Sequence, residues 1–184
     1  LFLNWSPCVK WSDTGLVFKP WGNVRILGVL QRIALCYFFA SVIIYYGKSR
    51  MALFIGMMIL VIYWVLTFTL GVPGHPYSLS GYFGNAIDLN VLGISHVYKG
   101  EGVPFDPEGL TSTLPAIVQV IFGYLVGEYI QLKGKNFEML AKLILTGVIL
   151  VFVGYIWDFS FPINKKIWTS SYVLYTSGLA IITL

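Results

Sequence analysis

The sequence has few charged residues. Only 11% of its 184 residues are Asp, Glu, Lys or Arg, whereas soluble domains contain about a quarter. This number is too small to cover a water-facing surface, which argues against an ordinary soluble domain. Hydrophobic residues make up 57% of the chain, which excludes a disordered protein. The composition fits a lipid bilayer, where lipid takes the place of a polar shell.

Cysteines and metal-binding motifs are also scarce. The two cysteines, Cys8 and Cys36, predict no particular disulfide and lack metal-ligand spacing. His75 and His96 are 21 residues apart, which is not a zinc motif. The sequence contains no Gly-rich phosphate loop and no nucleophile elbow. We therefore expect no metal site, and we read the net charge of +4 as a sign of membrane orientation rather than of nucleic-acid binding.

Long apolar runs predict transmembrane helices. Residues 51–70 contain no charged residue and would extend about 30 Å as a helix, the thickness of the hydrocarbon core. Further spans are expected at 26–46, 107–130, 139–157 and, incomplete, 169–184. The short link at 47–50 makes the first two spans antiparallel neighbours. We predict an all-α, polytopic transmembrane helix bundle of about five spans, forming a single membrane domain over 1–184.

Both ends of the sequence suggest a piece of a longer protein. Leu1 is not a methionine, and Leu184 lies inside an apolar run. We therefore expect these residues to be a fragment of a larger multi-span domain.

Basic residues predict the orientation. The links 47–50 and 132–138 contain four Lys or Arg in 11 residues, whereas the opposite side contains six in 72. By the positive-inside rule the two links are cytoplasmic, and the long segment 71–106 is periplasmic or lumenal. Within it, residues 85–94 predict a short helix on the membrane surface or over a site between helices. We expect an integral protein of a bacterial inner membrane.

Arg32 is a charged side chain inside the first predicted span. It would lie about 9 Å below the outer edge, at a cost of up to about 2.5–3.5 kcal/mol. A structural partner on another helix would offset this cost. An anionic ligand would do the same, because a guanidinium pairs with phosphate or carboxylate through two hydrogen bonds. Arg25 would share the helix face of Arg32, and Gln31 adds donors beside it.

Two carboxylates mark the expected start of the third span. Asp106 has the position of an N-cap, Pro107 that of the first helical residue and Glu108 that of the first turn. Capping alone would explain both acids. At the outer mouth of a membrane helix they could also orient a base or bind a sugar hydroxyl or amine. Asp106 and Glu108 are therefore our candidate catalytic residues.

Two adjacent lysines stand on the expected outer side. Lys165 and Lys166 are either solvated loop charges or, with Asn164 and the start of the next helix, an anion site. Trp168 lies in the same segment, and His96 lies in the outer loop. We name Trp168 and His96 as candidate substrate-binding residues.

Three segments resemble those of one known family. They are residues 25–37 (RILGVLQRIALCY), 105–115 (FDPEGLTSTLP) and 162–172 (PINKKIWTSSY), and their order also agrees. In them the chain resembles the heparan-alpha-glucosaminide N-acetyltransferase family and its bacterial relatives, some of which are described as N-acetylglucosamine-related transporters. The resemblance covers nearly all of this chain but only the middle and later part of the family's domain.

The resemblance implies a membrane acyltransferase that passes acetyl from acetyl-CoA to the amino group of a terminal glucosamine on the lumenal or periplasmic side. The residues that match the family's motifs would line or brace the site: Gln31, Arg32, Asp106, Glu108, Asn164, Lys165 and Lys166. We assign Arg32 and the lysines to the CoA phosphates or the thioester carbonyl. Asp106 or Glu108 would serve the acceptor or the family's histidine, which lies in an earlier helix and is matched by neither His75 nor His96.

Two other functions remain open from the sequence. A transporter of aminosugars or cell-wall fragments would use the same charges, but it should show paired broken helices, and only one span carries an internal proline, Pro115. A structural subunit would use its polar groups only to lock helices together. Small residues are spaced for helix packing at Ser112, Ala116, Gly123 and Gly127. Membrane lipid and a small-molecule or glycan substrate are the expected partners, and a homo-oligomer remains open.

Overall fold

Helices dominate the computed structural model, which describes residues 9–12, 15–18, 22 and 24–184. The elements in chain order are β1 (Val9–Ser12), β2 (Gly15–Phe18), α2 (Val29–Leu70), α3 (Phe83–Leu92), the 3₁₀ helix η2 (Ile94–His96), α4 (Leu110–Lys133), α5 (Phe137–Asp158) and α6 (Ser170–Thr183). The all-α membrane bundle is confirmed, whereas the antiparallel β1–β2 hairpin was not predicted. Cys8 lies outside the described residues, and Cys36 is buried in α2.

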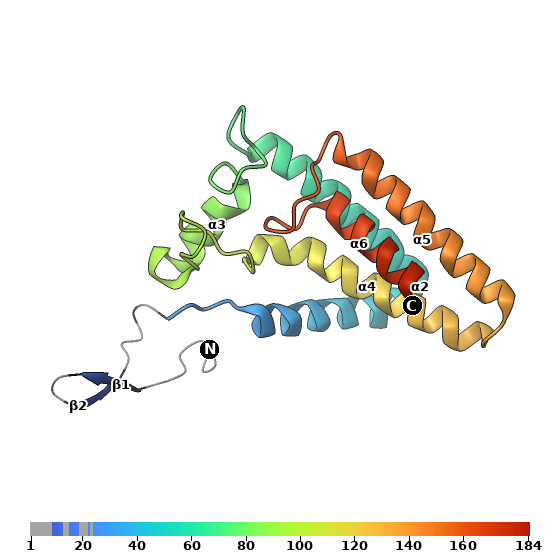
Figure 1. Ribbon diagram of the computed structural model, residues 1–184, viewed down its shortest axis with the longest axis horizontal. Helices are drawn as coiled ribbons and strands as arrows, with labels where there is room; N and C mark the ends of the chain where they lie inside the picture. The colour runs from blue at the N-terminus through green and yellow to red at the C-terminus, as the bar shows by residue number, and fades with distance from the viewer. Residues whose placement is uncertain (1–8, 13–14, 19–21, 23) are drawn as a thin grey trace.

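The long helix α2 is a helical hairpin. Its helical backbone is interrupted at Lys48, whose φ of 54° lies in the left-handed region. Figure 1 shows the chain reversing direction there, so that the two halves of α2 run in opposite directions. The first two expected spans and the link between them are thereby confirmed. The first begins at Val29, three residues later than predicted.

Three of the described helices are long and apolar enough to cross a membrane: α2, α4 and α5. With 42 residues and a reversal in the middle, α2 has the length for two crossings. The fifth expected span is present as α6, whose 14 residues fall short of a full crossing. These lengths and hydropathies indicate an integral membrane protein.

The two short links lie at the same end of the bundle. In the link of α2, Ser49 Oγ donates a hydrogen bond to Glu128 near the end of α4, and the α4–α5 link begins six residues later, at Gly134. At the opposite end, the Tyr77 hydroxyl donates to the Ser160 carbonyl oxygen at 2.9 Å, which joins the long loop to the α5–α6 loop. The arrangement puts both basic links on one side, as the predicted orientation requires. Which side is cytoplasmic stays a prediction.

The close packing of α5 against α6 depends on glycines. A Cβ at Gly178 would lie 2.6 Å from the carbonyl oxygen of Gly147. One at Gly154 would lie 2.7 Å from a backbone nitrogen of α6. Backbones come this close only where side chains are absent. The small residues of α4 that were predicted to allow helix packing differ from these glycines. A Cβ at Gly123 or Gly127 would have no neighbour within 4 Å, so none of the described helices packs closely at either position.

We expect Gly178→Ala to destabilise the purified protein by about 1–3 kcal/mol, the usual cost of overpacking. The added methyl group has no room between α5 and α6. Gly127→Ala is the matched control, since the same change in α4 meets open space and favours the helix. Thermal unfolding in detergent measures both. Equal melting temperatures for Gly178→Ala and the unmodified protein would contradict the close packing.

Candidate functional site

Arg25 precedes α2 and reaches carboxylates from a distant part of the chain. Its Nε lies 3.0 Å from Asp106 Oδ2 and its Nη2 lies 2.5 Å from Asp106 Oδ1. The same Nη2 pairs with Glu108. Because the Asp106 side chain is fully buried, its charge requires such a partner. The predicted helix face shared by Arg25 and Arg32 is wrong, because α2 begins only at Val29.

The backbone around Asp106 forms a turn rather than the start of a helix. Asp106 Oδ1 accepts a hydrogen bond from the Glu108 nitrogen at 3.0 Å, and Oδ2 accepts one from the Tyr98 nitrogen at 3.3 Å. Helix α4 begins later, at Leu110, with Gly109 as its N-cap residue. The prediction that Asp106 caps this helix is therefore wrong. Its carboxylate fixes the loop that leads into the helix.

Asp88 of α3 caps α4 instead. Its Oδ1 accepts hydrogen bonds from the nitrogen and the hydroxyl of Thr111, both at 3.4 Å. Gly109 makes this approach possible, since a Cβ there would lie 1.8 Å from Asp88 Oδ2. Burial raises the pKa of Asp88 to about 6, although the hydrogen bonds from Thr111 and Leu110 oppose this shift. The short helix predicted at 85–94 is confirmed as α3, and it braces the start of α4.

Arg32 lies in the first turn of α2 and is 8% exposed. Its Nη1 donates to the Pro107 carbonyl oxygen at 2.9 Å. Its Cζ lies 3.8 Å from the ring centroid of Trp168, a cation–π contact. A carbonyl dipole and an aromatic face thus take the place of water around this charge. Because α2 starts late, Arg32 lies only about 4.5 Å from the helix start, about half the predicted depth.

The loop between α5 and α6 is closed by Asn164 and Thr169. The Asn164 nitrogen donates to Thr169 Oγ1 at 3.0 Å, and the Thr169 nitrogen donates to the Asn164 carbonyl oxygen at 3.2 Å. Asn164 Oδ1 also accepts from the Lys166 nitrogen at 2.9 Å. Trp168 in this loop has a φ of 52°, a strained value for a residue with a side chain. Such strain persists where the surroundings fix the residue, and it is common at functional sites.

One pocket joins α2, the start of α4 and the α5–α6 loop. Its volume is about 480 Å³, and its charged lining residues are Arg32, Glu108 and Lys165. Trp168 and Gln119 also line it. The volume lies within the range of roughly 300–1,000 Å³ that is usual for small-molecule sites. Two cations and one carboxylate from distant segments therefore share one hollow, in which Arg32 and Lys165 suit an anionic group and Glu108 suits a cation or a proton donor.

The other candidate residues are placed differently. Five of them do not line the pocket: Gln31, His96, Asp106, Asn164 and Lys166. His96 Nδ1 donates to the Val24 carbonyl oxygen at 2.7 Å, which holds the segment before α2. Lys166 forms an ion pair with Glu101 of the long loop. The structure thus separates the two adjacent lysines, and only Lys165 lines the pocket.

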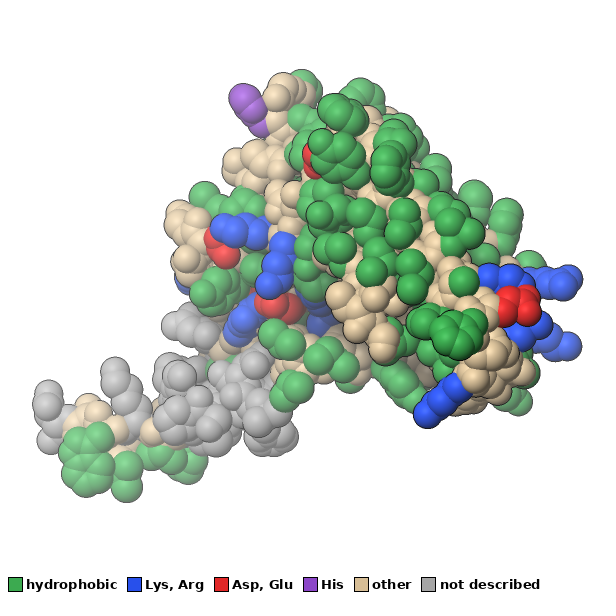
Figure 2. Space-filling view, turned by 45° about the vertical axis from the view of Figure 1, so that its right-hand side comes forward, with side chains coloured by type: hydrophobic (Ala, Val, Ile, Leu, Met, Phe, Trp, Pro, Cys, Tyr) green, Lys and Arg blue, Asp and Glu red, His purple; other side chains and the backbone are tan. Residues whose placement is uncertain are grey.

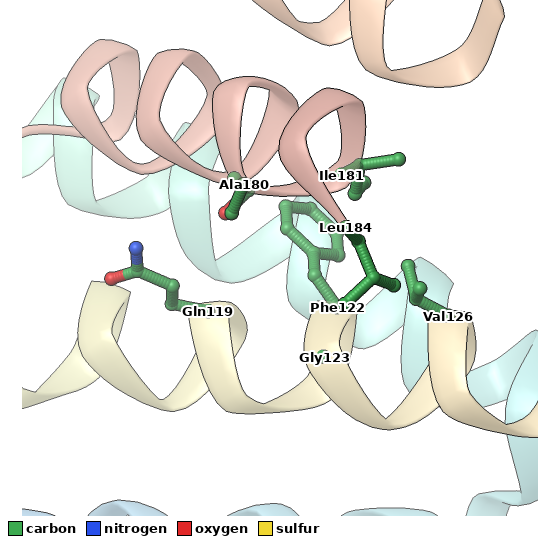
Figure 3. Close-up of a pocket in the computed structure, with 8 residues that line it drawn as sticks. Gln119, Phe122, Gly123, Val126, Ala180, Ile181 and Leu184 are labelled. Carbon is green, nitrogen blue, oxygen red and sulfur yellow. The ribbon is translucent and has the colours of Figure 1, made fainter. Parts of the chain in front are cut away.

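Gln119 is a pocket residue that the sequence analysis did not name as a candidate. Its Nε2 donates to Thr176 Oγ1 of α6 at 3.1 Å. It also lines a smaller cavity of about 210 Å³ between α4 and α6, with Phe122 and Ile181 among the other lining residues (Figure 3). The sequence could have indicated Gln119 as a candidate site residue, because it is an amide side chain within a largely apolar predicted helix.

We expect the titration of Asp88 to make stability depend on pH. Its folded pKa of about 6 lies above the ordinary value of 3.8, so the folded state binds more protons than the unfolded state between these values. The free energy of unfolding should therefore fall as pH rises from about 4 to about 6. Asp88→Asn keeps an oxygen acceptor for Thr111 but does not titrate. Its melting temperature should exceed that of the unmodified protein at pH 7.5, and the two should converge toward pH 4. Parallel curves across this range would contradict the assignment.

Comparison with known proteins adds an independent observation. The chain is 28% identical over 218 aligned residues to the heparan-alpha-glucosaminide N-acetyltransferase of Homo sapiens, covering 89% of this chain and 32% of the human protein. To the Mus musculus protein of the same name it is 27% identical over 223 residues, covering 89% and 33%. No family model matches the sequence. The chain spans about a third of the length of these relatives. The resemblance carried by the three motifs is confirmed, and the chain is related to heparan-alpha-glucosaminide N-acetyltransferases.

Proposed function

We propose that this chain is part of a membrane N-acetyltransferase that passes acetyl from acetyl-CoA to the amino group of an aminosugar or glycan. The observation that carries the proposal is the pocket in which Arg32, Glu108 and Lys165 meet. The names of the two relatives describe N-acetyl transfer to a glucosaminide, which supports the proposed reaction but does not name its donor. The protein would lie in a bacterial inner membrane, with the pocket near the periplasmic face and the basic links in the cytoplasm.

Arg32 and Lys165 suit a negatively charged donor. Lys165 is exposed and forms no ion pair with the residues that the structure describes, so its ammonium is available to a phosphate of CoA. Arg32 uses Nη1 for Pro107, which leaves further N–H groups of its guanidinium for the thioester carbonyl. Donors fixed beside this oxygen stabilise the negative charge that it gains in the tetrahedral intermediate.

Glu108 suits the acceptor amine. One carboxylate oxygen, Oε2, pairs with Arg25, whereas Oε1 accepts no hydrogen bond from the described residues. Glu108 would accept a proton from the amino group, either directly or through the family's histidine. The amine nitrogen then forms a bond to the carbonyl carbon, the carbon–sulfur bond breaks, and CoA leaves as a thiolate that takes up a proton. Asp106 would act by holding Arg25, and Trp168 would offer its surface to the sugar ring.

Transport is less well supported by the structure. Transporter helices that bind substrate are interrupted near the middle of the membrane. Within the described residues, the interruption of α2 lies in the link at the end of the bundle. Helix α4 continues through Pro115 from Leu110 to Lys133. Neither helix has the paired break that an inverted-repeat transporter requires.

Radiolabelled acetyl-CoA and glucosamine test the proposed function. The full-length protein in liposomes should transfer the label to the amino group of the sugar. Uptake of unacetylated sugar into sealed liposomes would instead indicate a transporter. If the protein neither transfers the label nor takes up sugar, the proposal is contradicted and the structural role is favoured.

The two adjacent lysines give a sharper prediction. Lys165→Gln should raise the KM for acetyl-CoA about tenfold, equivalent to about 1.4 kcal/mol, because its ammonium lines the pocket. Lys166→Gln is the matched control and should change the KM little, since that lysine pairs with Glu101. Steady-state kinetics with both variants measures the difference. Equal effects of the two substitutions would show that the pocket is not the donor site.

A further inference from the structure

A groove on the bundle lies apart from the pocket described above. It has a volume of about 440 Å³ and is formed by the second half of α2 together with α4, α5 and α6. Most of its lining is apolar, including Leu53, Met57, Phe122, Leu125, Ile149 and Leu150. Helices α4 and α5 touch little along their length, whereas α5 packs closely on α6. The groove therefore occupies a space that the protein itself leaves unfilled.

The polar lining residues gather toward one end of this groove. They are Tyr129 near the end of α4, and Lys142 and Thr146 in the first half of α5. Tyr129 and Lys142 thus lie next to the α4–α5 link. Leu150 is eight residues beyond Lys142, or about 12 Å along the helix. The groove therefore leads from a hydrogen-bonding, cationic rim into an apolar interior.

The rim has an excess of positive charge. Lys133 and Lys135 lie at the α4–α5 link and Lys142 follows in the first half of α5, with Glu138 as the acid between them in the sequence. Lys142 Nζ lies 2.5 Å from Glu138 Oε1, but both side chains are more than half exposed, so this pair is weak. Figure 2 shows Lys and Arg side chains around an acidic one at the right-hand end of the bundle. A phosphate group would complement this rim.

We propose that this groove binds an anionic phospholipid. One acyl chain lies against α2, α4 and α5, and the phosphate accepts hydrogen bonds from the Lys142 ammonium and the Tyr129 hydroxyl. The apolar lining would accept the acyl chain of any lipid. The preference for an anionic headgroup therefore comes from the charged rim. The bound lipid fills the space between α4 and α5 and so stabilises their arrangement.

Thermal unfolding of the full chain in detergent tests this site. Phosphatidylglycerol should raise the melting temperature by several degrees, and phosphatidylcholine with the same acyl chains should raise it less. Lys142→Gln should weaken the apparent affinity for phosphatidylglycerol about tenfold. Lys99→Gln is the matched control, because Lys99 is an exposed lysine in the long loop at the other end of the bundle, and it should leave the affinity unchanged.

Two further variants distinguish lipid binding in this groove from a general effect of charge or folding on the melting temperature. Glu138→Gln removes the competing acid and should strengthen the response to phosphatidylglycerol. Met57→Trp adds bulk within the groove without changing any charge, and should weaken the response to both lipids. Equal responses to the two lipids, or an unchanged affinity in Lys142→Gln, would overturn the proposal.

Discussion

A fully buried carboxylate, Asp106, organises the pocket end of this bundle, and Arg25 compensates its charge. To reach it, the segment before α2 must dock against the turn before α4. The same turn offers the Pro107 carbonyl to Arg32 and brings Glu108 to the pocket. Removing one member of a buried pair leaves an uncompensated charge, which costs far more than an exposed pair contributes. The positions of Arg32 and Glu108 in the pocket therefore depend on this contact, whereas Lys165 is placed by the α5–α6 loop.

The charges at this end divide into two kinds. Asp106 and Lys166 have ionic partners within the protein, and the buried Asp106 holds the loop before α4 in place. Lys165 forms no ion pair with the described residues, while Arg32 and Glu108 each use part of their hydrogen-bonding capacity within the protein. A site for a charged substrate needs both kinds, because the first fixes the geometry and the second meets the ligand. Asp88 also fixes the geometry at this end, because its carboxylate holds α3 against the start of α4.

The membrane spans could be predicted because hydropathy is a local property of the sequence. The meeting of three segments at one site was expected from the family resemblance, because each segment carries one of its motifs, and one pocket contains residues from all three. The start of α4 was predicted wrongly because its cap, Asp88, lies more than 20 residues earlier in the chain. Which of two adjacent lysines lines the pocket depends on the turn closed by Asn164 and Thr169, which sequence spacing does not reveal.

A double-mutant cycle on Arg25 and Asp106 tests the central claim most directly. The account predicts that Arg25→Gln destabilises the folded protein in detergent by about 3–5 kcal/mol, because it leaves Asp106 buried and charged. Asp106→Asn removes that charge, so adding it to Arg25→Gln should recover much of the loss and give a coupling energy of about 1–3 kcal/mol. Additive effects of the two substitutions would contradict the claim that this ion pair organises the pocket.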